Sequence, residues 1–439
     1  MNSKYQIIAG MVLWLSCSMA AAVPVIQHWQ TSNGVDVYFV ATDGLPIVDA
    51  RLVFNAGSAY DGKDYGLAAL TSSLLDQGAA GENAQQIAEQ LESVGAQLST
   101  GSSRDFSSIS FRSLSDPAAL NAAWAVFKNI LNAADFPAQD FEREKQRSLL
   151  SIKRRQESPG VLAQLALYQE IYKEHPYANP IQGDALSVSN IGLDELKGFY
   201  QQYYVASNAK LVLVAGVSRQ QAEDMAENLL ADLPVGHKAR PIAEVGEITQ
   251  GKAIHVEYPS QQTHIMYSLP VMIHNDADNF ALYLGNHILG GSGFSSRIVK
   301  EIREERGLAY SAYSYFHPMV QKGPFLIGLQ TRNEKRDEAV AAVKQTLAEF
   351  IEDGPTKQEL IAAKKNISGS FALRLDSNKK LLASVVNIVA SDAPLDYLNT
   401  YLQNIEAVSV EQIREAFQRR LIVDKMVMVT AGQATGEKQ

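Results

Sequence analysis

Cysteine is almost absent from this chain of 439 residues, because Cys17 is the only one. Cys17 lies just before a run of small residues, Ala20 to Ala22, after which we expect the chain to be cleaved. The mature protein would then contain no cysteine, which excludes a disulfide, a thiol nucleophile and a cysteine-based metal site. A lipid attached to Cys17 is an alternative, although Trp14 and Leu15 fit poorly before such an attachment site.

Long hydrophobic runs are also missing. Residues Ile7 to Leu15 are mostly apolar and follow Lys4, an order typical of a secretory signal peptide over residues 1–22. A membrane-spanning helix needs about 20 apolar residues, and neither this stretch nor a later one is that long. We therefore predict an exported protein with no membrane span, located in the periplasm of a Gram-negative bacterium. An ordinary buried first helix is the alternative.

Blocks of basic residues are lacking as well. The chain has 39 Lys and Arg against 48 Asp and Glu, which gives a net charge of −9. An acidic chain without a basic cluster is a poor candidate for binding nucleic acid or an anionic membrane. Its hydrophobic content of 46% is ordinary for a folded globular protein.

Strand-like and helix-like segments alternate along the chain. The helix predicted from Phe141 to Glu157 is expected to stop at Pro159, and a second helix is predicted from Ser295 to Glu305. The same order recurs in the second half. The dipeptide Ala-Gly ends a strand at residues 215–216 and again at residues 431–432, 216 positions later. A repeat of this length predicts two related domains.

The two predicted domains are separated by a segment rich in Pro, Gly and charge, which is typical of a surface linker. We place a signal peptide at 1–22, an N-terminal domain at 23–235, the linker at 236–250 and a C-terminal domain at 251–439.

Two segments carry a family resemblance. The first runs from Asp64 to Gly78 and contains Gly-Leu-Ala at residues 66–68, and the second runs from Ser295 to Ser311. In both, the chain resembles the insulinase/pitrilysin family of zinc peptidases, particularly its mitochondrial processing peptidase branch. The resemblance covers almost the whole mature chain. It implies an α+β fold of two homologous domains, each with a mostly antiparallel sheet packed by helices.

The zinc-binding residues of that family are missing. Active members carry H-x-x-E-H after Gly-Leu-Ala, where two His bind zinc and the Glu acts as the base. Here those positions are Ala69, Ser72 and Ser73, and the third ligand position falls at Ser151, with Glu144 nearby. A methyl group and hydroxyls cannot hold zinc. We predict that this chain has no metal site and no cofactor of its own.

No other catalytic motif replaces the lost one. The eight His residues show no i, i+4 pair on a predicted helix, and Gly-x-Ser-x-Gly is absent. Residues 290–293, Gly-Gly-Ser-Gly, lack the Lys and the spacing of a phosphate-binding P-loop.

The second segment keeps two residues to which the resemblance assigns a role. In the family an Arg and a Tyr seven residues apart bind the substrate backbone and the developing oxyanion, and here they are Arg303 and Tyr310. Alternatively, Arg303 belongs to a solvated charge pattern and Tyr310 to the core. The resemblance also makes Gly290, Gly291 and Gly293 a substrate-binding loop, whereas glycine here could equally form a tight turn into the helix.

These residues together predict a non-catalytic subunit of an exported heterodimeric zinc peptidase. The partner would be a homologous subunit that carries zinc, and the substrate a peptide or unfolded protein. A non-enzymatic peptide-binding or scaffold protein of the same fold is the alternative. An independent metallopeptidase with a displaced site is a third reading, which the ligand chemistry disfavours.

Overall fold

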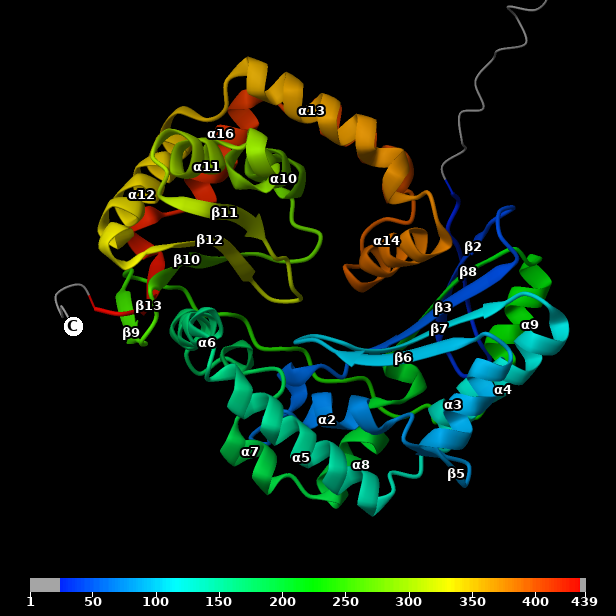
Figure 1. Ribbon diagram of the computed structural model, residues 1–439. Coiled ribbons are helices and arrows are strands. Elements are labelled where there is room, and N and C mark those ends of the chain that lie inside the picture. Colours follow the sequence, from blue (N-terminus) through cyan, green and yellow to red (C-terminus); the bar gives the residue numbers. More distant parts are fainter. Residues whose placement is uncertain (1–23, 435–439) are drawn as a thin grey trace, which may run out of the picture.

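Two β-sheets with helices on both faces make up the structure, a computed structural model that describes residues 24–434 (Figure 1). The predicted signal segment 1–22 and Cys17 lie outside the described residues. The strands of the first sheet are, in spatial order, β1 (Gln27–Gln30), β2 (Asp36–Ala41), β8 (Ala209–Ala215), β3 (Ile47–Phe54), β7 (Ser107–Leu114) and β6 (Gln97–Ser102). Only β2 and β8 run parallel.

The second sheet repeats this arrangement. Its strands are, in spatial order, β11 (Ala309–Phe316), β12 (Gly323–Arg332), β10 (Gln262–Met272), β13 (Val427–Gly432) and β9 (Ala253–Glu257). Here β13 and β9 form the parallel pair, and the other pairs are antiparallel. Without β1, the two sheets have the same strand order when strands are numbered within each half. The α+β fold with mostly antiparallel sheets is therefore confirmed.

Helices of the first half cover one face of the first sheet. They are α2 (Leu67–Leu74), α3 (Ala84–Ser93), α4 (Pro117–Asn132), α8 (Leu193–Tyr203) and α9 (Arg219–Leu230), while α5 (Ala138–Arg155) packs on α2 and on α7 (Ala185–Asn190). A short hairpin, β4 (Gly78–Ala79) with β5 (Glu82–Asn83), precedes α3. Pro117 is the first residue of α4, and the Asp116 carboxylate accepts the N–H groups of Ala118 and Ala119.

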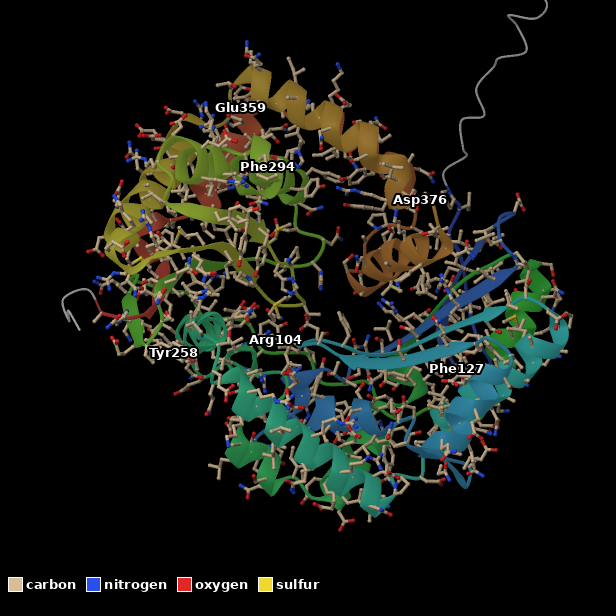
Figure 2. The ribbon with its side chains drawn as sticks, viewed as in Figure 1. Arg104, Phe127, Tyr258, Phe294, Glu359 and Asp376 are labelled. Atoms are coloured by element: carbon tan, nitrogen blue, oxygen red, sulfur yellow. The ribbon has the colours of Figure 1, made fainter. Side chains whose placement is uncertain are left out.

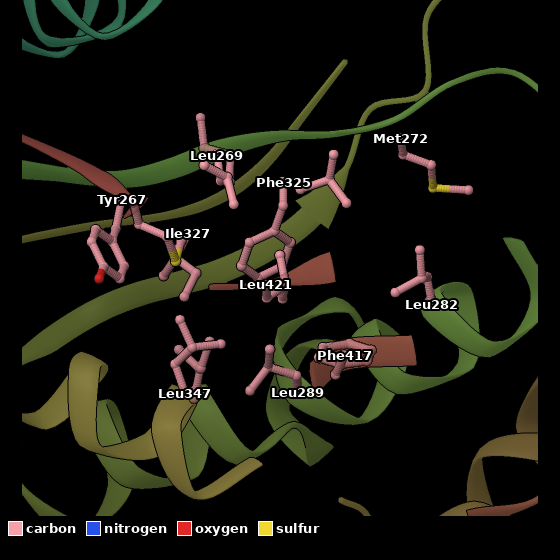
Figure 3. Close-up of a cluster of buried hydrophobic side chains, with 14 of the residues drawn as sticks. Tyr267, Leu269, Met272, Leu282, Leu289, Phe325, Ile327, Leu347, Phe417 and Leu421 are labelled. Carbon is pink, nitrogen blue, oxygen red and sulfur yellow. The ribbon is translucent and has the colours of Figure 1, made fainter. Parts of the chain in front are cut away.

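The second half has the corresponding helices. They are α10 (Asn279–Asn286), α11 (Arg297–Val299), α12 (Arg336–Asp353), α13 (Lys357–Phe371), α15 (Tyr397–Ala407) and α16 (Val410–Arg420). Figure 3 shows how this core closes: Phe325 and Ile327 from β12 meet Leu347 of α12 and Phe417 of α16, all fully buried.

The two halves exchange one helix each. Helix α6 (Pro159–Tyr172) belongs to the first half but packs on β10 and β13 of the second sheet, burying Leu167 and Ile171 there (Figure 1). Helix α14 (Asn378–Ala390) belongs to the second half but packs on β3 and β8 of the first sheet, burying Val385 against Val212. Each sheet is therefore covered on one face by a helix from the other half.

The exchange begins at Pro159, where the sequence prediction was wrong. Pro159 was expected to stop the preceding helix, but α5 already ends at Arg155 and Pro159 is the first residue of α6. Proline is well tolerated at that position because its missing N–H would have no partner in the first turn.

The helix predicted from Ser295 to Glu305 is also different. A short 3₁₀ turn (Gly293–Ser295) precedes α11, and the chain then widens into a π-helix over Lys300–Glu305. The Arg306 N–H donates to the carbonyl of Glu301, five residues back, at 3.3 Å. π-helical turns are rare and occur frequently at functional sites.

Between α9 and β9 the chain has no helix or strand. This stretch includes the predicted linker 236–250, yet Ile242, Val245 and Ile248 are buried in the core of the second half. The domain boundaries remain a prediction, because the exchange of α6 and α14 ties the halves together. Within residues 24–434, no helix combines the length and apolar character that crossing a membrane requires.

Candidate functional site

Helix α2 carries three of the four predicted zinc-site positions. Ala69 and Ser73 are half-buried and Ser72 is buried. The Ser73 hydroxyl donates to the carbonyl of Leu70 at 2.9 Å, so it is occupied by its own helix. The side chain of Ser72 faces the core beside Tyr204, whose pKa burial raises to about 12 while the neighbouring Ser107 and Ser72 hydroxyls oppose the rise. None of these groups is a zinc ligand.

The start of α2 is fixed by one carboxylate. Both oxygens of Asp61 accept backbone N–H groups, from Gly66 and Ala68, each at 2.8 Å. Burial raises the pKa of Asp61 to about 7, although these two hydrogen bonds act in the opposite direction. Gly66 has a φ of 96°, and a Cβ there would lie 2.9 Å from the backbone of Gln182. The helix scaffold is thus well ordered even though its metal-binding side chains are gone.

The fourth position, Ser151, lies exposed on α5. Glu144, two helical turns earlier, is buried, but it forms ion pairs with Arg147 at 3.0 Å and Arg143 at 3.5 Å. Nowhere in residues 24–434 do three or more His, Cys, Asp or Glu side chains gather closely enough to hold a metal ion. The side chains that are present therefore do not fit zinc.

Arg303 and Tyr310 are in direct contact in the second half. The guanidinium carbon of Arg303 lies 4.5 Å from the centroid of the Tyr310 ring. It also lies 4.5 Å from the centroid of the Phe294 ring. Both rings are exposed, Tyr310 by 82% and Phe294 by 66%, so this cation–π cluster of Arg303, Tyr310 and Phe294 lies at the surface (Figure 2 labels Phe294).

Local structure explains how the two residues meet. Gly307 takes a φ of 59°, a left-handed conformation expected at a helix end, and turns the chain from the π-helix into β11. The pairing of β11 with β12 is interrupted between Ala309 and Ala312, and this bulge contains Tyr310.

The neighbouring acids do not neutralise Arg303. Glu301 pairs with Arg306 at 2.5 Å, and Glu305 pairs with Lys300 at 3.6 Å. Among the described residues Arg303 has no ion-pair partner, so the solvated charge pattern considered as an alternative does not include it. Its charge is available to a ligand.

The two matching family descriptions divide the chain between them. "Insulinase (Peptidase family M16)" matches residues 38–185, and "Peptidase M16 inactive domain" matches residues 190–367. A crystal structure of a peptidase M16 inactive domain from Pseudomonas fluorescens is 38% identical, aligns with 94% of this chain and 99% of its own, and has a TM-score of 0.91.

The chain belongs to the insulinase (M16) family of peptidases.

Two other relatives are less similar in sequence. The "Non-peptidase homolog YmxG" of Helicobacter pylori is 26% identical over 97% of this chain and 98% of its own length. The "Uncharacterized zinc protease YmxG" of Bacillus subtilis is 23% identical over 89% of this chain and 94% of its own. The predicted resemblance is confirmed, and without zinc ligands on α2 and α5 this chain is an inactive M16 member.

Close packing, not freedom to move, accounts for most of the glycines in the predicted substrate loop. A Cβ on Gly290 would collide with Ser314 of β11, and one on Gly291 would lie 2.8 Å from the side-chain nitrogen of Asn286. Gly293 has open space around it and a φ of 65°. Close approach therefore explains two of the three glycines, and their role in substrate binding remains a prediction.

Phe294 is the site residue that sequence reasoning missed. It follows Gly293 directly, and a large aromatic residue at the end of a glycine-rich turn has little neighbouring chain to cover it. That signal could have marked it as exposed. Its contact with Arg303 depends on the π-helix, which apolar spacing does not predict.

Proposed function

We propose that this M16 chain is the non-catalytic subunit of an exported heterodimeric zinc peptidase. It provides Arg303 and Tyr310 to the site of a homologous subunit that carries zinc. The observation that supports the proposal is the contrast between the two regions. The zinc positions hold Ala69 and three serines, whereas Arg303 and Tyr310 are retained and in contact, with Arg303 half-buried and Tyr310 exposed.

The arrangement of the chain supports a role across an interface. Figure 1 shows α2 in the lower part of the molecule and α11, next to Arg303, in the upper left part. Arg303 and Tyr310 are thus remote from their own α2. If they act on a reacting peptide bond, that bond lies on another polypeptide's metal site.

The chemistry of the pair suits an oxyanion. A guanidinium stays charged at any physiological pH, and a phenol donates one hydrogen bond. Contacts with the Phe294 and Tyr310 rings restrict Arg303, which reduces the reorganisation needed when a carbonyl oxygen gains negative charge. A bound peptide would also meet two exposed aromatic faces.

The proposal is tested by co-expressing the chain with a zinc-motif homologue from the same genome and measuring peptide cleavage by the purified complex. Arg303→Ala and Tyr310→Phe are each expected to lower kcat by about 10²–10³, the usual effect of losing one oxyanion donor. Arg306→Ala is the matched control, because Arg306 lies on the same segment but pairs with Glu301. Unchanged cleavage in both variants would reject the assignment.

A non-enzymatic peptide-binding or scaffold role is the second candidate, favoured by the non-peptidase designation of the Helicobacter pylori relative. In that case the protein binds peptide without cleaving it, and replacing Arg303 changes no cleavage rate. Export to the periplasm is part of the proposal and is tested by fractionating cells and determining the N-terminal residue of the mature chain.

A further inference from the structure

A cavity of about 960 Å³ lies between the two halves, separate from the site described above. Val53 of β3 and Phe106 of the turn between β6 and β7 line it from the first half, and the second half contributes Met272, Phe280 and Met319. Neither α2 nor the cation–π cluster of Arg303 lines it. Its volume is at the upper end of the range of about 300–1,000 Å³ for small-ligand pockets, and most of its wall is apolar.

Three guanidinium groups line this cavity, and none pairs with a carboxylate among the described residues. Arg51 donates from Nε to the Ser110 hydroxyl at 2.8 Å, and burial lowers its pKa. Arg104 donates from Nε to the carbonyl of Tyr177 at 3.0 Å. Burial lowers its pKa as well, and Figure 2 shows it near the end of the first sheet closest to α6.

The third, Arg374, has only phenols as partners. It donates to the hydroxyl of Tyr401 at 3.3 Å and to that of Tyr283. Both tyrosines also line the cavity. The two phenols also share a side-chain hydrogen bond with each other, so one of their two protons is left to donate to a ligand. Arg374 and the two tyrosines together form a cluster of donors suited to a carboxylate.

The opposing charges are fewer. Asp276 is paired with Arg420 at 2.7 Å, so it is neutralised within the wall. Asp105 accepts from the Tyr177 hydroxyl and from the N–H of Val320, and burial raises its pKa. His274 and His317 also face the cavity, and burial lowers the pKa of both. With the histidines neutral, the wall keeps a surplus of positive charge.

We propose that this cavity binds a single-chain amphipathic anion, an acyl chain that ends in a carboxylate. The apolar wall takes the chain, and Arg374 with Tyr283 and Tyr401 takes the carboxylate. Arg374 is exposed and has no carboxylate partner among the described residues, so a carboxylate that enters the cavity from solvent would pair with it while the acyl chain covers the apolar wall.

Isothermal titration of the full mature chain with three probes tests the proposal. Dodecanoate, kept below its micelle concentration, should bind saturably with one molecule per chain and raise the melting temperature. Dodecanol has the chain without the charge, and acetate the charge without the chain. Both should bind at least tenfold more weakly than dodecanoate.

Two variants locate the site. Arg374→Gln should weaken dodecanoate binding by about 10- to 100-fold, as expected for losing hydrogen bonds to a charged group. Asn387→Trp fills the cavity from an exposed position on α14, so it should fold and yet abolish binding. Arg154→Gln, exposed on α5, is the matched control and should bind as the unaltered chain does.

The proposal is overturned by any of three results. In the first, dodecanoate shows no saturable binding. In the second, dodecanol binds as tightly as dodecanoate. In the third, dodecanoate still binds the Asn387→Trp variant. If Arg374→Gln does not fold, Asn387→Trp still decides. Peptidase activity of the complex is not measured, so the outcome is independent of the proposed function.

Discussion

Arg297 and Glu359 form a two-pronged ion pair between the start of α11 and the start of α13. The Arg297 Nε lies 2.7 Å from one carboxylate oxygen, and Nη2 lies 2.6 Å from the other. The Glu359 carboxylate also accepts the N–H and hydroxyl of Thr356, which begins α13. This pair anchors the segment that leads to Arg303.

Replacing Glu359 should destabilise the fold in a pH-dependent way. Burial opposes ionisation, but the bonds from Arg297 and Thr356 prevail and lower the pKa of Glu359 to about 2. A carboxylate whose pKa is lower in the folded than in the unfolded chain stabilises the fold at pH values above its unfolded pKa. This contribution is lost as the pH falls through about 4.5 towards 2. Since the pair is partly exposed, we expect Glu359→Gln to cost about 1–2 kcal/mol at pH 7, measured by urea unfolding.

The exposed pair of Lys380 and Asp376 provides the control for that prediction. Asp376→Asn should change the free energy of unfolding by less than about 0.5 kcal/mol. A Glu359→Gln variant as stable as the unaltered chain at pH 7 would show that Arg297 is held by other contacts.

Mild acid should destabilise the protein through His274. Burial, reinforced by the nearby His317, lowers the pKa of His274 to about 4. The unfolded chain therefore binds more protons between about pH 6.5 and 4, and stability falls as the pH is lowered through that window. In the His274→Gln variant, the free energy of unfolding should fall less between pH 7 and pH 4.5, by on the order of 2 kcal/mol. Guanidinium unfolding at pH 7 and pH 4.5 measures it, and the exposed His237→Gln is the control.

The helix exchange should make the two halves unfold together. Leu167→Ala on α6 removes a fully buried side chain from the second core and should cost about 2–5 kcal/mol. The melting curve should nevertheless keep a single transition, shifted as a whole. Leu186→Ala, at a position that is 75% exposed, should have almost no effect. Two transitions, only one of them shifted, would mean that the halves fold independently.

Chelation should leave the isolated chain unchanged. Ligands that bind only the native state raise its melting temperature, so removing a structural zinc would lower it. We expect EDTA to shift the melting temperature by less than about 1 °C and metal analysis to find far less than one zinc per chain. The zinc-motif homologue, treated in parallel, is the positive control. Stoichiometric zinc in this chain would contradict the loss of the site.

Much of the fold follows from the sequence because most strands and helices are bounded by local signals. Pro117 and Asp116 mark the start of α4, and the mostly apolar segment Lys210 to Val217 predicts the strand β8. The spacing of about 216 residues between repeated segments also anticipates two sheets of equal strand order. Ala69, Ser72 and Ser73 are visible as lost ligands because the surrounding motif remains.

Other features depend on contacts that a local pattern does not contain. Whether Pro159 stops one helix or starts the next is decided by the second sheet, which buries Leu167. The π-helix at 300–305 has the same apolar spacing as an α-helix, so the sequence does not distinguish them. The neighbours of Arg303 follow only from that difference.

The helix exchange also imposes an order on biogenesis. A ribosome delivers the first sheet, including β8 at residues 209–215, long before it delivers α14 at 378–390. Until then, the α14 side chains that pack on Val212 and Val214 of β8 are missing from that face. The nascent chain therefore carries an uncovered hydrophobic surface while more than 150 further residues are synthesised. It avoids aggregation only if the first sheet folds after α14 has been made or if a chaperone covers that surface.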